Sequence, residues 1–172
     1  QSSIDEVLAF YRNKILSHDN INENKKINIS KDGTVKIKKF KLKSSDPSGY
    51  FVSGCSLRLI IKIESENILK NCYLNIGFID ENHEIKFISN SLIQTNEYFD
   101  INRKRNLVLN IKELPLTEGE YYYHIKLTSD NETKIKIMYC EKFSVYAGDF
   151  FKSGRILNVK EGMLVNSKWD FG

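Results

Sequence analysis

The side chains that could perform chemistry are few in this sequence, and their spacing matches none of the common catalytic motifs. The histidines, His18, His83 and His124, are widely separated, and no glycine-rich phosphate loop, nucleophile elbow or HExxH helix occurs. Asp80 and Glu81 are adjacent, but they fall in a predicted turn, where solvated acids are common. The sequence therefore predicts a binding protein that is not an enzyme and uses no cofactor or metal.

The cysteines, Cys55, Cys72 and Cys140, are odd in number and far apart. No CxxC occurs, and no histidine lies at metal-ligand spacing from any of them. The spacing therefore favours neither a metal site nor a catalytic thiol. Cys72 instead falls in the apolar phase of a predicted strand. We interpret all of them as reduced thiols that pack as small apolar side chains, which is typical of a reducing compartment.

Lysines are concentrated in residues 34–44, TVKIKKFKLKS. They could form a basic patch for phosphate, or they could protect an edge strand from pairing with other chains. The net charge of +4 is mild for 172 residues, and lysines and acids are interspersed. We therefore favour the edge strand and expect no nucleic-acid partner.

Alternation of apolar and polar residues predicts the strands that position the remaining candidates. The change of phase after Ile37 predicts a bulge near Lys38 or Lys39, and a second bulge is expected before Phe143. Short strands separated by turn residues predict an all-β fold, an antiparallel immunoglobulin-like β-sandwich with a short N-terminal helix. The expected core-facing residues are Val35, Ile37, Phe40 and Leu42; Leu57, Leu59, Ile61 and Ile63; Cys72, Leu74, Ile76 and Phe78; Ile85 and Phe87; Leu107, Leu109 and Ile111; Tyr121, Tyr123, Ile125 and Leu127; and Ile135, Ile137 and Tyr139.

The two ends of the chain differ from this central region. Residues 2–16 have an apolar stripe at helical spacing, and residues 18–33 are polar. We expect residues 1–33 to be the helix and linker that follow a preceding domain, and residues 34–172 to form the sandwich. The apolar residues from Ile156 to Val165 predict a last strand, which could pair within its own subunit or across a dimer axis.

The candidate binding site lies on the outer face of one predicted sheet. Greek-key connections would place the third, fourth, sixth and seventh predicted strands in that sheet, and Gly77 would leave a dent in it. Tyrosines on this face offer aromatic rings for stacking, and amide, ammonium and imidazole groups offer hydrogen bonds. An ordinary solvated sheet face would have the same polarity, so this alternative stays open. The candidate binding residues on this face are Tyr73, Asn75, Lys86, Tyr122 and His124.

Three segments also carry a family resemblance. NIGFIDENHEIKFISNS (75–91) is a strand, an acidic turn and a strand, LPLTEGEYYYHIKL (114–127) follows the pattern LPL-x-x-G-x-Y, and GMLVNSKWDFG (162–172) is a glycine-led tail with a tryptophan. They resemble the C-terminal domain of the Wzt family, the ATPase subunits of bacterial O-antigen ABC exporters. VLAFYRNKI (7–15) is similar to the helix that ends such ATPase domains.

The resemblance implies a β-sandwich that binds the non-reducing end of a finished, lipid-linked O-polysaccharide at the cytoplasmic face of the bacterial inner membrane. With this ligand, the candidate residues Tyr73, Asn75, Lys86, Tyr122 and His124 become the predicted carbohydrate-binding residues: tyrosine rings suit the CH surface of a sugar ring, and the polar groups suit its hydroxyls. Binding would couple chain completion to export by the ABC transporter. The resemblance also implies a homodimer formed through the C-terminal strand. It further implies contact with the exporter's transmembrane subunit through an ATPase domain that this sequence lacks.

Two other classes of function make different demands. A protein-interaction module without glycan binding would present an exposed apolar patch or a free sheet edge. A polysaccharide-modifying enzyme would need paired carboxylates about 5–10 Å apart in a cleft, and the predicted strand faces offer none.

Overall fold

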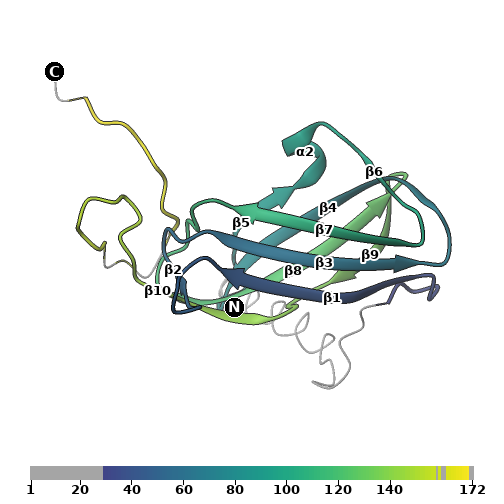
Figure 1. The fold of residues 1–172 in the computed structure, drawn as a ribbon, viewed down its shortest axis with the longest axis horizontal. Coiled ribbons are helices and arrows are strands. Elements are labelled where there is room, and N and C mark those ends of the chain that lie inside the picture. The colour runs from purple at the N-terminus through teal and green to yellow at the C-terminus, as the bar shows by residue number, and fades with distance from the viewer. Residues whose placement is uncertain (1–28, 158, 160–161, 171–172) are drawn as a thin grey trace, which may run out of the picture.

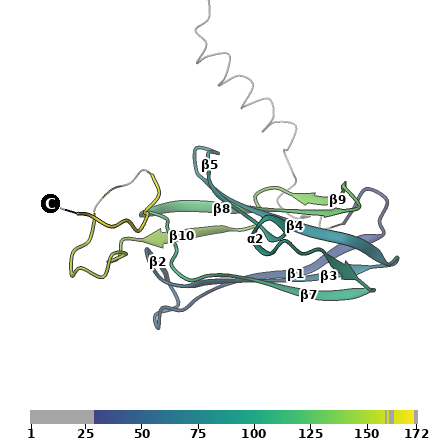
Figure 2. The ribbon, with the colours of Figure 1, turned by 90° about the horizontal axis from the view of Figure 1, so that it is seen from above.

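The computed structural model describes residues 29–157, 159 and 162–170. The expected helix over residues 2–16 and most of the expected linker lie outside them, so both stay predictions. Strands dominate the described residues (Figure 1) and form two sheets stacked face to face (Figure 2). The predicted all-β sandwich is confirmed. None of the helices in this described part is long and apolar enough to cross a membrane.

The smaller sheet has three antiparallel strands in the order β1–β3–β7, namely β1 (Val35–Ser44), β3 (Leu57–Ser65) and β7 (Lys104–Ile111). Its register shifts between Ile37 and Lys39, which confirms the predicted bulge. Two β1 lysines pair with acids on or beside β3: Lys38 with Glu64 at 3.4 Å, and Lys36 with Glu66 at 3.8 Å. β1 is the first strand in the order of this sheet, so the lysine-rich strand is an edge strand, as predicted.

The larger sheet holds the third, fourth, sixth and seventh predicted strands together, as expected. Its order is β2–β10–β8–β4–β5, with β6 paired to β4 and β9 paired to β8. All pairings are antiparallel except that of β2 with β10. The strands are β2 (Phe51–Val52), β4 (Leu69–Asp80), β5 (Ile85–Asn90), β6 (Phe99–Ile101), β8 (Gly119–Ser129), β9 (Glu132–Ile137) and β10 (Lys142–Tyr146).

The core lies between the two sheets, and its largest members come from β4 and β8. Tyr123 and Phe78 are completely buried, and their ring centroids are 6.3 Å apart. Phe40 of β1 meets Tyr123 edge-on at 6.0 Å, so the two sheets share an aromatic contact. Each such side chain contributes about 1.5–3 kcal/mol by burial, so these rings are major contributors to the stability of the core.

Two expected core positions are wrong, and local irregularities explain both. Residues 138–141 leave the ladder between β9 and β10, where Tyr139 has a φ of 50°. Tyr139 therefore leaves the core, and Cys140 is completely buried instead. A register shift between Phe78 and Ile79 likewise exposes 55% of Ile85, and only Phe87 stacks on Phe78, at 4.5 Å.

The short helix α2 (Ser91–Thr95) was not predicted, because five residues are too few to show helical periodicity. The side chain of Asn90 caps it by accepting a hydrogen bond from the backbone N–H of Ile93 at 2.9 Å. Asn96 ends it in the left-handed region, with a φ of 57°. α2 therefore turns the chain sharply away from the end of β5.

The expected strand from Ile156 to Val165 is wrong for the single chain: its described residues contain only an isolated bridge between Leu116 and Met163. Before this segment, the carboxylate of Asp149 accepts hydrogen bonds from the backbone N–H groups of Ser153 and Gly154. This turn directs the chain away from the sheet, and the tail extends beyond the sandwich (Figure 1).

The interpretation of the cysteines as packing residues is confirmed, since none of the three forms a disulfide and Cys72 and Cys140 are completely buried. Burial raises the pKa of Cys72, so this thiol is poorly suited to act as a nucleophile.

Candidate functional site

The outer face of the larger sheet carries four of the five predicted site residues. Tyr73 and Asn75 of β4 and Tyr122 and His124 of β8 point away from the core, because they alternate with its buried residues. All four are half-buried. We call this surface of β4 and β8 the outer face; from Tyr73 to Tyr122 it extends about 20 Å at the usual rise of a strand.

One end of the outer face is an aromatic corner, formed by Tyr122, Tyr139 and His83. Tyr139 meets Tyr122 edge-on at 5.6 Å, and His83 lies 5.1 Å from Tyr139. Sequence reasoning missed Tyr139 and His83 as site residues. The only signal for Tyr139 was the change of phase before Phe143, and His83 lies in a turn whose shape the sequence does not specify.

His124 fills the dent predicted at Gly77. These residues are opposite each other on neighbouring strands, and a Cβ added to Gly77 would lie 2.1 Å from Cε1 of the imidazole. Nδ1 of His124 is buried, and the described residues offer it no hydrogen-bond partner. Burial, with a smaller contribution from the charge of Lys136, lowers the pKa of His124, so the ring is neutral at pH 7.

The centre of the outer face offers hydrogen bonds. Oδ1 of Asn75 accepts a hydrogen bond from Nδ2 of Asn90 at 2.6 Å, and this bond fixes the orientation of the Asn75 amide group. Lys126 lies opposite Asn75 on β8, and Lys136 lies opposite Lys126 on β9. The centre of the face is therefore polar and cationic, between tyrosines at both ends.

The fifth predicted residue, Lys86, is not on the outer face. Its Nζ lies 2.7 Å from Oδ2 of Asp80 and 3.4 Å from Oε2 of Glu84, and only 16% of its side chain is exposed. Asp80 shares the core-facing phase of Phe78, and Lys86, the extra residue of β5 opposite Phe78 and Ile79, lies on that side. The prediction that Lys86 points outward on the same face as the other candidate residues is therefore wrong.

The Lys86–Asp80 pair is a stabilising ion pair, and the pKa shifts of both residues agree. The hydrogen bond to Asp80 raises the pKa of Lys86. Burial acts to raise the pKa of Asp80, but the hydrogen bond and charge of Lys86 and the backbone hydrogen bonds from Glu84 and Asn82 together outweigh it and leave that pKa below its usual value. Both shifts favour the charged forms.

We predict that Lys86→Met destabilises the protein by about 2 kcal/mol, because it leaves the mostly buried carboxylate of Asp80 unpaired. Thermal unfolding at pH 7 should show a midpoint roughly 4–8 °C lower. Since the pKa of Asp80 is lowered, the wild type keeps this contribution at pH 5 and loses it as the pH falls through that pKa. Polymer binding should be unchanged. Lost binding with an unchanged midpoint would show that Lys86 is a binding residue and not a stabilising one.

A cleft of about 370 Å³ opens beside the outer face, between β7 and the segment from α2 to β6. Its floor is aliphatic and includes Leu74, Ile76 and Leu107. Its rim includes Tyr98, whose ring meets Tyr73 of the outer face at 6.4 Å. Sequence reasoning missed the cleft because one side of its rim comes from α2 and the short segment between α2 and β6, which carry no periodic signal.

Binding is the chemistry that these surfaces support, through aromatic stacking and hydrogen bonding. In residues 29–157, 159 and 162–170, no group of three or more histidine, cysteine or carboxylate side chains is arranged to hold a metal ion.

Comparisons with known proteins give a structural likeness only. No family model matches the chain, and no curated protein sequence matches it. The crystal structure of the C-terminal domain of Wzt is similar over 77% of this chain and 84% of that chain, with a TM-score of 0.58 and 12% identity. A putative β-galactosidase from Bacteroides fragilis gives a TM-score of 0.43 and 9% identity over 62% of this chain and 16% of that chain, too low to support an argument. The described residues thus have a fold like that of the C-terminal domain of Wzt.

Proposed function

We propose that this chain is a non-catalytic carbohydrate-binding domain that recognises the non-reducing end of a lipid-linked O-polysaccharide. In this proposal, binding on the cytoplasmic side of the inner membrane couples chain completion to export by an ABC transporter. The exporter's transmembrane subunit would be reached through an ATPase domain outside this sequence.

The observation that carries the proposal is the combination of stacking and hydrogen-bonding groups along the outer face. The aromatic corner at Tyr122 is adjacent to a polar centre that includes Asn75 and His124, and the buried aromatic core beneath holds these residues in place. Tyrosine rings suit the CH faces of sugars, and amide and imidazole groups suit their hydroxyls. The sandwich shared with the C-terminal domain of Wzt supports the proposal at the level of the fold.

A panel of isolated O-polysaccharides tests this function. The panel should include the polymer of the producing strain and unrelated polymers of similar length. We expect saturable binding of the strain's own polymer in a surface-immobilised array and little binding of the others. No binding to any polymer would contradict the proposal.

We propose in addition that the domain is a homodimer held by its C-terminal tail. Ile156 is 60% exposed, Val165 61% and Trp169 80%. Apolar side chains in such number are costly to leave in water, and a second copy could cover them.

Deleting residues 154–172 is therefore predicted to give a monomer or insoluble protein. Light scattering on the purified variant measures its mass, and Trp169→Ala in the full chain should weaken the dimer without abolishing folding. A soluble dimer of unchanged stability after the deletion would rule out the tail as the interface.

A second candidate function is that of a protein-interaction module, which the edge at β5 favours. Ile85 and Ile88 of β5 are 55% and 54% exposed, and Ile93 of α2 is 80% exposed. β5 ends the strand order of its sheet, and its lysine, Lys86, is already paired with Asp80. Ile88→Lys distinguishes the two functions: it should leave polymer binding intact and abolish a protein contact made at this edge.

A further inference from the structure

The cleft between β7 and the α2–β6 segment is the cavity on which we base a further inference. β5 ends at Asn90, the chain turns away through α2, and the edge of the sheet resumes only at Phe99 of β6. Beyond this gap, β7 is the last strand of the smaller sheet. The interior of the sandwich is therefore accessible at this point.

The walls of the cleft divide into an apolar floor and a polar rim. Leu74, Ile76 and Leu107 contribute aliphatic side chains from both sheets to the floor. The rim residues are Gln94, Glu97, Tyr98, Arg105 and Asn110, all of them exposed. Such a cavity suits a ligand with one apolar group and several hydroxyls.

The rim groups retain capacity for a ligand after their contacts within the protein. Nη1 of Arg105 donates to the carbonyl of Asp100 at 2.8 Å, and its guanidinium lies 5.4 Å from the centre of the Phe99 ring. This fixes the side chain and commits one of its five N–H groups. Oε1 of Gln94 accepts a bond from Ser89 at 2.8 Å, which directs its NH₂ group elsewhere.

Charge and size restrict the class of ligand. The rim has one cation, Arg105, and one anion, Glu97, so it does not favour phosphate or carboxylate ligands. A volume of about 370 Å³ lies near the lower end of the range for small-molecule sites, which suits a single sugar ring. Ser89 and Ser91 also line the cleft, but their hydroxyls are already bonded, that of Ser89 to Oε1 of Gln94 at 2.8 Å and that of Ser91 to the backbone N–H of Leu74 at 3.0 Å. A C6 hydroxyl placed against the aliphatic floor would therefore lose affinity relative to a methyl group.

We infer that the cleft binds a 6-deoxyhexose residue, with the ring against Tyr98, the methyl group on the aliphatic floor and the hydroxyls toward Arg105, Gln94 and Asn110. This inference rests on the proposed function, because it makes the residue part of the polymer that the outer face binds. The Tyr73–Tyr98 contact joins the two surfaces. The cleft would then select polymers that contain a sugar without the C6 hydroxyl.

Matched sugars test this inference on the full 172-residue chain. L-Fucose and L-galactose differ only at C6, as do L-rhamnose and L-mannose. NMR titration of the amide resonances should show that, in at least one pair, the deoxy sugar binds about tenfold more tightly than the hexose. The shifted resonances should belong to α2, β6 and β7.

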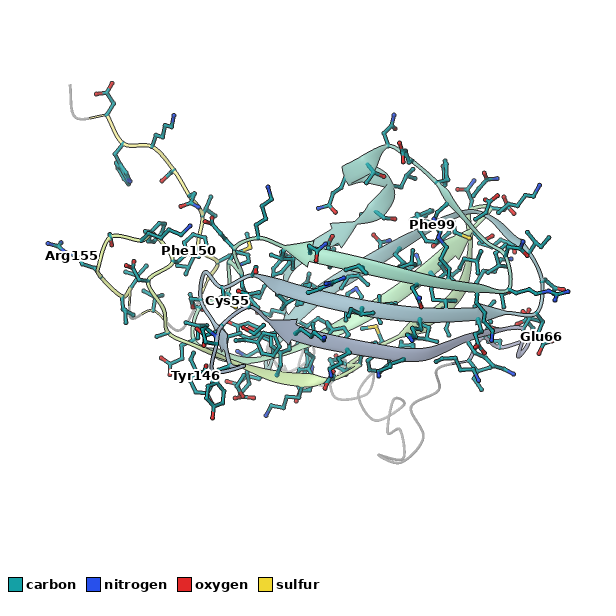
Figure 3. The ribbon with its side chains drawn as sticks, in the orientation of Figure 1. Cys55, Glu66, Phe99, Tyr146, Phe150 and Arg155 are labelled. Carbon is teal, nitrogen blue, oxygen red and sulfur yellow. The ribbon has the colours of Figure 1, made fainter. Side chains whose placement is uncertain are left out.

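Tyr98→Ala should remove this binding. Tyr146→Ala is the matched control, because Tyr98 and Tyr146 are 51% and 49% exposed and each ring meets another tyrosine edge-on. Tyr146 lies at the end of the sandwich opposite Phe99 of the cleft (Figure 3). The control should bind the deoxy sugar as the wild type does.

The outcomes separate this inference from the proposed function. Equal affinities within both pairs, no saturable binding, or shifts confined to the outer face would overturn the inference, even if the polymer binds. Binding of the deoxy sugar in the cleft without binding of any polymer would overturn the proposed function and leave the cleft as a sugar site.

Discussion

Replacing Gly77 by alanine should destabilise the protein by about 2 kcal/mol and displace the imidazole of His124 from the outer face. The added Cβ would lie 2.1 Å from Cε1 of His124, well below any tolerated contact. The ring must rotate, or the two central strands must separate, and overpacking of this kind typically costs about 1–3 kcal/mol. Urea unfolding measures the change in free energy.

Two variants make the Gly77 experiment specific. Gly119→Ala, on the neighbouring strand β8, is the control, because its Cβ would come no closer than 3.4 Å to a side chain and should cost little. His124→Ala combined with Gly77→Ala removes the clash, so the double variant should be more stable than Gly77→Ala alone. A Gly77→Ala variant as stable as the wild type would show that the imidazole does not occupy this position.

Tyr122→Ala should weaken binding of the producing strain's polymer by about 2 kcal/mol, roughly 30-fold, because truncating a tyrosine anchor of a binding site typically costs this much. Tyr122 forms the aromatic corner with Tyr139, and its ring is half-buried, so the melting temperature should change little. Isothermal titration at pH 7 measures the affinity.

Controls decide whether the ring itself is responsible. Tyr122→Phe keeps the aromatic face and should retain most of the affinity, and Asn75→Ala should lose part of it. Tyr146→Ala, on β10, should bind as the wild type does. If the Tyr122→Ala and Asn75→Ala variants both keep wild-type affinity, the polymer binds elsewhere on the domain.

The sandwich was predictable because alternation was strong where burial was complete. Along β3 and β8, every second residue reaches the core, and the sequence shows this pattern directly. The errors lie where one extra residue or a left-handed residue changes the phase. The φ of 50° at Tyr139 and the shift at Ile79 depend on how neighbouring strands fit, which a periodic pattern does not contain.

The same local features decided how much of the site was predictable. Tyr73, Asn75, Tyr122 and His124 lie in regular stretches of β4 and β8, so alternation placed them correctly on one face. Lys86 lies at a bulge and turned to Asp80, and Tyr139 left the core at another irregularity. The cleft needed the capped turn at Asn90 and the short strand β6, neither of which has a periodic signal.

The most direct test of the account is a calorimetric titration of the domain with the producing strain's O-polysaccharide, intact and after removal of its terminal non-reducing residue. The two polymers share the same repeating units and differ only at the end. We predict saturable binding of about one polymer end per site for the intact chain and a loss of at least tenfold in affinity for the trimmed chain. Equal affinity for both polymers, or binding to neither, would contradict the claim that this domain recognises the polysaccharide terminus.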